Sequence, residues 1–434
     1  MTPHRVAALT AAAVALLTLG MAAPAAAGRP HAALSGRSPL QAAAGRRDAV
    51  PAAQAVPAFV PCPVVPVPSI PPNPSPPPPA THGTGHRTIG GEALDTAGLV
   101  LPPGVPPPPA VLSARSWVVA DLDTGAVLGA CGPHEFGAPA SVQKLLLAET
   151  VLPKLDPAQV VEITQQDLNF EPGSSAVGLL LGGHYPVETL WLGLFLNSGN
   201  DAANVLARLG GGPAGVPGTI EAMNAEAHRL GAYDTHAVTP SGLDGPGQLT
   251  SAYDLALIAR ACFARDDFRR YDAAQRAQIP PQPPKDPTGY QIQNDNQLLY
   301  DYPGAMGGKN GFTDIARHTF VGAAERGGRR LVVALLGAEH LPVRAWQQGA
   351  ALLDWGFAVA PGVSVGRLVD PGEADRPSPV PSRAAAPAPD RQAPAVHAAR
   401  TWTSGTAMAG AAAAAGASLV LLTALRMRLR RRTR

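Results

Sequence analysis

The distribution of proline limits where this chain can build a large folded core. Many of its 48 prolines cluster toward the two ends of the 434-residue sequence. The run from Pro71 to Pro79 is expected to form extended polyproline II. Between the two clusters, hydrophobic residues are frequent enough to form a core. We therefore predict Pro/Ala-rich disordered linkers at residues 28–109 and 361–405, and one folded domain at residues 110–360.

Apolar segments at the two ends predict export and membrane anchoring. Residues 1–27 begin with a positive charge at Arg5, continue with a short apolar stretch and end in small residues, which is typical of a cleaved signal peptide. Residues 406–425 are uncharged and about long enough to cross a bilayer, and six arginines follow within residues 426–434. The positive-inside rule places this basic tail in the cytoplasm. We therefore expect a single-pass cell membrane protein, anchored by the C-terminal helix, with its domain outside the cell.

The cysteines, histidines and net charge exclude several classes of site. An exported domain permits disulfides, and Cys131 and Cys262 both lie inside the predicted domain, so these two could pair and leave Cys62 over. The sequence contains no C-x-x-C spacing and no H-E-x-x-H pattern, so we predict neither a metal site nor a cofactor. The formal net charge of +2 gives no indication of a nucleic-acid partner.

Hydrophobic patterns and turn residues predict strands at both ends of the domain and helices between them. Strands are expected at residues 116–121 and 126–130, joined by a turn at Asp123, and at residues 319–324 and 331–337, joined by Gly327 and Gly328. Helices are expected after Ser141 and at residues 186–196, 201–209 (with Asp201 as its cap), 224–230, 253–263 and 345–357. This order of elements indicates an α+β fold.

Ser141 and Lys144 stand three residues apart at the start of an apolar, helix-forming run. Positions i and i+3 share one face of a helix, so the hydroxyl and the amine are expected to be neighbours. A serine hydroxyl becomes a strong nucleophile when a base takes its proton, and an amine acts as that base when burial or a nearby cation lowers its pKa. The spacing therefore suggests nucleophilic catalysis, although a lone S-x-x-K pattern is also common on protein surfaces.

Two further motifs follow in the same domain, Ser198-Gly199-Asn200 and Lys309-Asn310-Gly311. The ordered set S-x-x-K, S-x-N and K-x-G is the signature of penicilloyl-serine enzymes. With the flanking Ser241-Gly242-Leu243-Asp244 and Tyr302-Pro303-Gly304, residues 116–357 resemble the serine-type D-alanyl-D-alanine carboxypeptidases, which are the low-molecular-weight penicillin-binding proteins of peptidase family S11.

This resemblance implies a fold, a reaction and partners. The fold would be the penicillin-binding protein/β-lactamase-like transpeptidase fold, an antiparallel sheet flanked by helices with the active site at the edge of the sheet. The enzyme would remove the terminal D-alanine from peptidoglycan stem peptides ending in D-Ala-D-Ala, through an acyl-enzyme on Ser141. β-Lactam antibiotics such as penicillins would acylate the same serine.

The resemblance also assigns roles to individual residues. Lys144 would take the proton of Ser141, with the pKa of Lys144 lowered by the second cation, Lys309. Ser198 would relay a proton to the leaving nitrogen, and Asn200 would orient the substrate amide. Two backbone N–H groups, those of Ser141 and Phe312, would form the oxyanion hole. The substrate-binding set, which would also hold the terminal carboxylate, is Lys309, Asn310, Gly311, Phe312, Thr313 and Arg344.

Two positions depart from the family pattern. Asn310 stands where the family usually has Thr or Ser, which changes a hydroxyl that contacts substrate. Arg317 stands where a glycine is common, which is expected to alter the strand beside the site. Both departures affect specificity and rate more than the class of reaction.

Two other functions use the same motifs. A class A β-lactamase carries a general-base glutamate in an E-x-x-L-N setting after the second motif, and this pattern is absent here. A penicillin-binding sensor or scaffold would keep the fold without turnover, with Asn310 as the lesion. Release of D-alanine from a short D-Ala-D-Ala peptide distinguishes the carboxypeptidase from both.

Overall fold

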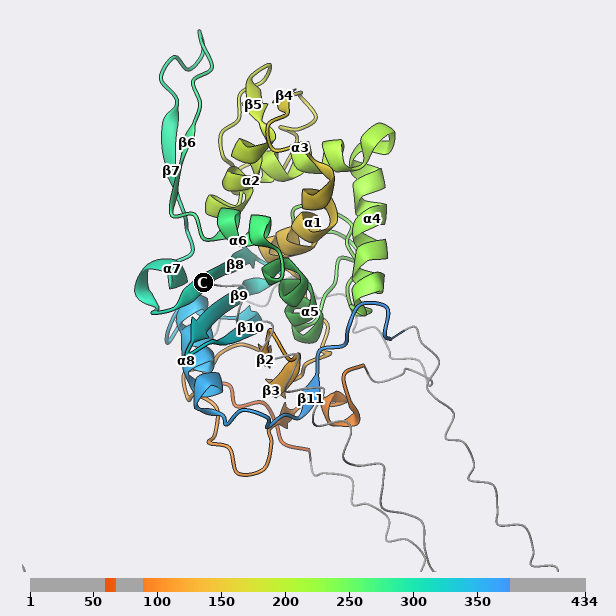
Figure 1. Cartoon of the computed structure of the whole chain (residues 1–434), viewed down its shortest axis with the longest axis vertical. Coiled ribbons are helices and arrows are strands. Elements are labelled where there is room, and N and C mark those ends of the chain that lie inside the picture. Colours follow the sequence, from red (N-terminus) through yellow and green to blue (C-terminus); the bar gives the residue numbers. More distant parts are fainter. Residues whose placement is uncertain (1–58, 68–88, 375–434) are drawn as a thin grey trace, which may run out of the picture. The chain divides into compact units, whose positions relative to one another are not determined.

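The fold is centred on one antiparallel sheet, seen in a computed structural model that describes residues 59–67 and 89–374 (Figure 1). The strand order is β1-β3-β2-β10-β9-β8, and β11 also pairs with β3. The strands are β1 (Leu99–Val100), β2 (Ser116–Asp121), β3 (Ala126–Cys131), β8 (Ala305–Thr313), β9 (Arg317–Arg326), β10 (Arg329–Ala338) and β11 (Gly366–Arg367). Pairing of β2 with β10, which places Val119 opposite Val333, joins the two sequence ends of the domain.

Helices cover both faces of the sheet (Figure 1). The α-helices of the described chain are α1 (Lys144–Val151), α2 (Val187–Leu196), α3 (Asn200–Gly210), α4 (Gly215–Leu230), α5 (Ala252–Phe263), α6 (Asp266–Asp272), α7 (Leu298–Asp301) and α8 (Ala345–Ala358). Helix α5 packs against β2 and β10, α8 packs against β9 and β10, and α2, α3 and α4 pack mainly against other helices. Successive side chains of a strand point to opposite faces. Accordingly Val118 belongs to the core beneath α1 and α5, whereas Val119 belongs to the core beneath α8. The α+β prediction with a sheet flanked by helices is therefore confirmed.

Shorter elements complete the described chain. Four 3-10 helices occur at η1 (Glu92–Leu94), η2 (Ala140–Gln143), η3 (Leu152–Lys154) and η4 (Gly212–Ala214). Two small antiparallel pairs lie outside the main sheet: β4 (Val160–Glu162) with β5 (His184–Pro186), and β6 (Arg276–Ile279) with β7 (Tyr290–Gln293).

The predicted strand pairs and most predicted helices form as expected, with two differences. Helix α4 begins at Gly215, well before residue 224. Pro217 does not prevent this earlier start, because it lies in the first turn of the helix, where a residue needs no N–H for an intrahelical hydrogen bond. The prediction that Asp201 caps α3 is wrong. Gly199 is the N-cap residue and makes no side-chain cap, whereas the carboxylate of Asp201 accepts hydrogen bonds from the backbone of residues 177–179.

Ordered structure extends beyond the predicted domain bounds of 110 and 360. The N–H of Leu99 donates to Val60 O at 2.7 Å, and the N–H of Val65 donates to Leu112 O at 2.8 Å. On the other side, β11 adds to the outer edge of β3. The sequence did not reveal these two segments. They lie in regions rich in proline, and each is tied to the domain by only a few backbone hydrogen bonds, so neither shows the regular pattern of a long strand or helix. The rest of both predicted linkers lies outside the described residues.

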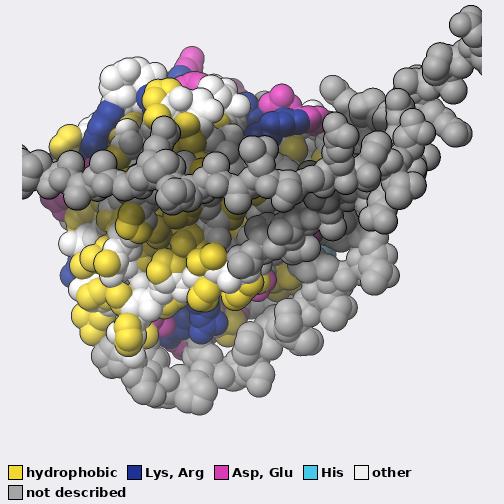
Figure 2. Space-filling view, turned by 90° about the horizontal axis from the view of Figure 1, so that it is seen from below, with side chains coloured by type: hydrophobic (Ala, Val, Ile, Leu, Met, Phe, Trp, Pro, Cys, Tyr) yellow, Lys and Arg dark blue, Asp and Glu magenta, His cyan; other side chains and the backbone are white. Residues whose placement is uncertain are grey.

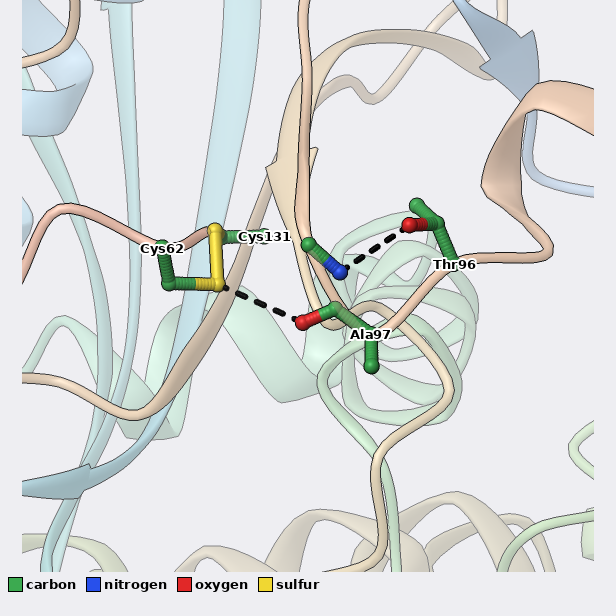
Figure 3. Close-up of a disulfide and its surroundings, with 5 residues drawn as sticks. Cys62, Thr96, Ala97 and Cys131 are labelled. Atoms are coloured by element: carbon green, nitrogen blue, oxygen red, sulfur yellow. Dashed lines mark hydrogen bonds between the residues drawn. A yellow bond between two sulfur atoms is a disulfide. The ribbon is translucent and has the colours of Figure 1, made fainter. Parts of the chain in front are cut away.

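The cysteine pairing differs from the expected one. Cys62 and Cys131 form a disulfide with Cα atoms 5.6 Å apart, and it fastens the segment 59–67 to the end of β3 (Figure 3). Cys262 is a buried free thiol. The expected pairing with Cys131 fails because the sheet separates the two residues: Cys131 belongs to the core beneath α8 and Cys262 to the core on the opposite face.

The surface and the predicted membrane segments complete the description. Viewed from below, the molecule shows hydrophobic side chains gathered among charged ones (Figure 2). In the segment 59–67, Phe59, Val60 and Val64 are exposed. Within the part of the chain that the structure describes, no helix has both the length and the apolar character needed to cross a bilayer. The predicted signal peptide (1–27), membrane helix (406–425) and basic tail (426–434) lie outside it.

Candidate active site

Ser141 and Lys144 meet where η2 runs into α1. Lys144 Nζ lies 2.8 Å from Ser141 Oγ. The same amine donates to Asn200 Oδ1 at 2.8 Å and to Ser241 O at 2.9 Å. The segment that contains Ser241 packs closely against the residue before the nucleophile, because a Cβ on Gly242 would lie 1.8 Å from Ala140 O. As predicted, the hydroxyl of Ser141 and the amine of Lys144 are therefore neighbours, and Lys144 is completely buried.

The surroundings of Lys144 favour its neutral form. Burial is the main cause that holds the pKa of Lys144 well below its usual range, and the nearby Lys309 is the second. Asp201 acts in the opposite direction. The predicted influence of Lys309 thus exists, but desolvation outweighs it. A neutral amine in contact with a hydroxyl has the geometry of a general base.

The second motif joins α2 to α3 and faces the amine. Ser198 adopts a left-handed backbone conformation with φ of 57°, and its hydroxyl is buried without a hydrogen-bond partner among the described residues. Asn200 bridges two groups, since its Oδ1 accepts from Lys144 and its Nδ2 donates to Ser174 Oγ at 2.9 Å. Between them, only glycine fits, because a Cβ on Gly199 would lie 2.4 Å from Val177 Cγ2.

The third motif lies on β8, the edge strand of the sheet. Lys309 points inward, is buried, and donates to Asn310 O at 2.8 Å. Burial lowers the pKa of Lys309 to about 8, although the carboxyl groups of Asp272 and Asp295 oppose this shift. Asn310 is exposed on the other side of the strand. Gly311 lets β8 approach the nucleophile, because a Cβ there would lie 2.7 Å from Ser141 N.

One cavity of about 680 Å³ brings the predicted site residues together. All ten line it except Lys144 and Lys309, which are buried. Arg344, at the N-cap of α8, is among the lining residues. Thr313 also lines the cavity, but its hydroxyl already donates to Asp244 Oδ1 at 2.8 Å and accepts from the N–H of Ala316 at 2.9 Å.

Arg317, the second departure from the family pattern, supports one wall of the cavity. Its backbone is left-handed with φ of 56°, a conformation that favours glycine. Its guanidinium forms two hydrogen bonds with Glu339, at 2.9 and 3.0 Å, and lies 5.5 Å from the centroid of the Phe312 ring. Phe312 in turn packs against His318 with ring centroids 4.7 Å apart. Arg317 therefore braces an aromatic wall that a glycine would leave unsupported.

Sequence reasoning missed several groups around the nucleophile. Ser241 O holds Lys144, Ser174 Oγ holds Asn200, and the hydroxyl of Thr319 donates to Pro139 O at 2.8 Å just before the nucleophile. Of these, Ser241 lies in one of the flanking motifs, but its contact is a backbone carbonyl, and Thr319 was expected only as the start of a strand. A backbone acceptor or an ordinary loop serine leaves no signal in residue type.

In the described part of the chain, one group of side chains has metal-ligand character. His134, Asp234 and Asp254 place possible ligand atoms within 4.8 Å of one another. His134 Nδ1 already lies 2.7 Å from Asp234 Oδ2, and none of the three lines the cavity. This group therefore takes no part in the arrangement around Ser141.

Comparisons with known proteins agree with this arrangement. The family model described as D-alanyl-D-alanine carboxypeptidase, Peptidase_S11, matches residues 105–340. D-alanyl-D-alanine carboxypeptidase DacB2 of Mycobacterium tuberculosis is 46% identical over 260 residues, which are 59% of this chain and 86% of that protein. D-alanyl-D-alanine carboxypeptidase DacD of Escherichia coli is 34% identical over 260 residues, and these cover 58% of this chain but only 64% of its own length.

Solved structures give the same result. A crystal structure of a D-alanyl-D-alanine carboxypeptidase from Mycobacterium tuberculosis is similar with a TM-score of 0.58 and 44% identity, covering 62% of this chain and 100% of that one. A Streptomyces DD-transpeptidase is similar with a TM-score of 0.55 and 26% identity, covering 58% of this chain and 100% of that one. The penicillin-binding protein type of fold is thereby confirmed, and the chain belongs to peptidase family S11, the serine-type D-alanyl-D-alanine carboxypeptidases.

Proposed function

We propose that this protein removes the terminal D-alanine from peptidoglycan stem peptides that end in D-Ala-D-Ala, through an acyl-enzyme on Ser141. The observation that carries the proposal is the buried amine of Lys144, 2.8 Å from Ser141 Oγ, because Ser141 lines a cavity together with residues of the second and third motifs. The names of the relatives support the substrate class.

Acylation begins with the transfer of the Ser141 proton to the neutral amine of Lys144. Ser141 Oγ then bonds to the carbonyl carbon of the penultimate D-alanine, and collapse of the tetrahedral intermediate breaks the C–N bond. The proton passes to the leaving nitrogen through Ser198. Its hydroxyl suits a relay because it has no partner among the described residues and lines the cavity.

The substrate backbone would lie along β8, an edge strand that pairs only with β9 in the sheet. The N–H groups of Ser141 and Phe312 would hold the oxyanion, and the close approach of Gly311 to Ser141 N supports this position. Lys309, Asn310 and Arg344 would supply the charge and donors for the terminal carboxylate. Asn200 would meet the substrate amide with the hydrogen of Nδ2 that Ser174 leaves unused.

Deacylation repeats the proton transfer with water. Lys144 takes a proton from water, the hydroxide attacks the Ser141 ester, and the proton returns to Ser141 Oγ as the ester bond breaks. Penicillins would form the same ester through opening of their strained amide ring, and the ester would persist because no leaving group departs from the cavity.

We also propose that the enzyme acts at the outer face of the cell membrane, held by residues 406–425. The apolar stretch and the arginines that follow it support this location. A peptidase that stays at the membrane surface would meet newly inserted stem peptides in the cell wall.

Mass spectrometry of the isolated domain after incubation with penicillin tests the function. We expect one adduct on Ser141, release of D-alanine from an acylated D-Ala-D-Ala peptide, and loss of both in Ser141→Ala with an unchanged fold. Labelling that survives in Ser141→Ala would refute the assignment of the nucleophile. Rapid hydrolysis of penicillin would favour the β-lactamase alternative, and a stable adduct without D-alanine release would favour the sensor or scaffold.

A further inference from the structure

Asp201 is a buried carboxylate beside the active site that no described Lys, Arg or His pairs with. Four backbone N–H groups donate to it instead. Oδ1 accepts from Val177 and Ala202, both at 2.9 Å, and Oδ2 accepts from Gly178 at 2.8 Å and Leu179 at 3.0 Å. Such charge-assisted bonds are about twice as strong as neutral ones. The carboxylate therefore fixes the backbone of residues 177–179 against the start of α3.

These bonds hold a loop that forms one wall of the cavity. Residues 171–175 line the cavity directly, and we call residues 171–179 the cavity loop. Two bonds from Asn200 tie the loop to the second motif: its N–H donates to Ser175 O at 2.9 Å, and its Nδ2 donates to Ser174 Oγ at 2.9 Å. The Ser174 hydroxyl is itself fixed, because it donates to Glu171 O at 2.6 Å.

This chain of bonds decides which end of the Asn200 amide faces Lys144. Because Ser174 already donates to Glu171, it accepts from Asn200 Nδ2. Asn200 Oδ1 is then left for the amine of Lys144, which it meets at 2.8 Å. A flipped amide would bring two donors together. One of the hydrogen bonds that hold Lys144 beside Ser141, the bond to Asn200 Oδ1, thus depends on the cavity loop.

We propose that Asp201 is a positioning residue for acyl transfer: it holds the cavity loop against Asn200 and thereby keeps Lys144 in place beside Ser141. The inference rests on the proposed function. It assigns Asp201 a role different from the helix cap that the sequence suggested, and it explains why a carboxylate is buried next to a base that works in its neutral form.

The pH profile separates this role from a merely structural one. The charged groups that face Lys144 are Lys309 from β8 and Asp201 from α3; its other partners are the neutral Ser141, Asn200 and Ser241 O. Asp201 raises the pKa of Lys144, so Asp201→Asn should lower that pKa further. Lys144 would then stay neutral at lower pH, so the acid limb of the plot of acylation rate against pH should shift to lower pH.

The experiment compares the wild type with Asp201→Asn and Asp201→Glu. It measures the rate of Ser141 acylation by a fluorescent penicillin, and kcat and KM on an acylated D-Ala-D-Ala peptide, across pH. For Asp201→Asn we expect a rate lower by about tenfold or more with little change in KM, together with the shifted acid limb. Asp201→Glu keeps a negative charge near Lys144, but the longer side chain cannot keep the four backbone hydrogen bonds, so it should be slow with a smaller shift of the acid limb than Asp201→Asn.

Asp167→Asn is the matched control. Asp167 is equally buried, and its carboxylate accepts from the backbone N–H and the hydroxyl of Thr164 and from two nitrogens of Arg208. Among the described residues, no side-chain hydrogen bond joins it to the cavity loop. We expect this control to lower Tm and to leave the rates and the acid limb of the folded protein unchanged.

The outcomes are decisive for the inference. An acylation rate in Asp201→Asn equal to that of the wild type would overturn it. So would a loss of rate that is explained by the unfolded fraction alone, with the acid limb at the pH of the wild type. If Asp201→Asn does not fold, a wild-type acylation rate in Asp201→Glu overturns it equally. A wild type that takes penicillin but releases no D-alanine would refute the proposed function, while the acylation rates would still test Asp201.

Discussion

Asn310 offers an amide where the family usually offers a hydroxyl. Its side chain lies exposed at the cavity with Arg344 among the lining residues, and an amide N–H₂ donates hydrogen bonds as a hydroxyl does. We expect Asn310→Ala to lower kcat/KM about ten- to a hundredfold, the value of one bond to a charged group, about 1.5–3 kcal/mol. Asn310→Thr should keep or raise it. Equal kcat/KM values for wild type and Asn310→Ala would show that Asn310 does not contact substrate.

Two lysines in different protonation states predict a bell-shaped dependence of kcat/KM on pH. Activity needs Lys144 neutral, so it should rise with pH through the lowered pKa of that group. It also needs Lys309 charged, so it should fall as pH rises past about 8, where burial places the pKa of Lys309. Steady-state kinetics on a D-Ala-D-Ala peptide checks both limbs. A basic limb that is unchanged in Lys309→Arg would assign it to another group.

At the scale of elements, the disulfide fastens a segment that lies before the family domain. Cys62 and Cys131 are 69 residues apart, so the cross-link should stabilise the fold by roughly 4 kcal/mol through the entropy of the unfolded chain. Neither cysteine lines the cavity. We therefore expect Cys62→Ser with Cys131→Ala to lower Tm clearly while kcat/KM at a lower temperature stays unchanged. A matching fall in kcat/KM would mean that the segment 59–67 also shapes the site.

Sequence patterns predicted elements whose signal is local. The spacing of Ser141 and Lys144, and the apolar strands around Val119 and Val333, could be recognised because neighbours along the chain decide their structure. The role of Asp201 could not, since a carboxylate at the start of a helix has the same local signature whether it caps the helix or anchors a distant loop. Cys62 was missed for a similar reason: its partner is fixed by the sheet, not by the sequence around it.

At the scale of the whole molecule, the catalytic domain and the predicted anchor are separate in the sequence. The cavity residues lie between Ser141 and Trp346, whereas the anchor is residues 406–425. Removal of residues 406–434 should therefore release an exported enzyme into the medium with unchanged kcat/KM, and the full chain should sediment with membranes. Fractionation of cells that express each form checks this. Recovery of the full chain in the medium would contradict the anchor.

The buried free thiol of Cys262 can report on local opening of the fold. Cys262 lies on α5 with its Sγ donating to Leu145 O of α1 at 3.3 Å, and burial raises the pKa of this thiol well above its usual range. It is therefore unreactive while the two helices stay together, and a thiol reagent can reach it only when they separate. Its labelling rate measures how often the layer that carries Lys144 opens. A bound β-lactam that tightens this layer should slow the labelling, without any fluorophore being introduced.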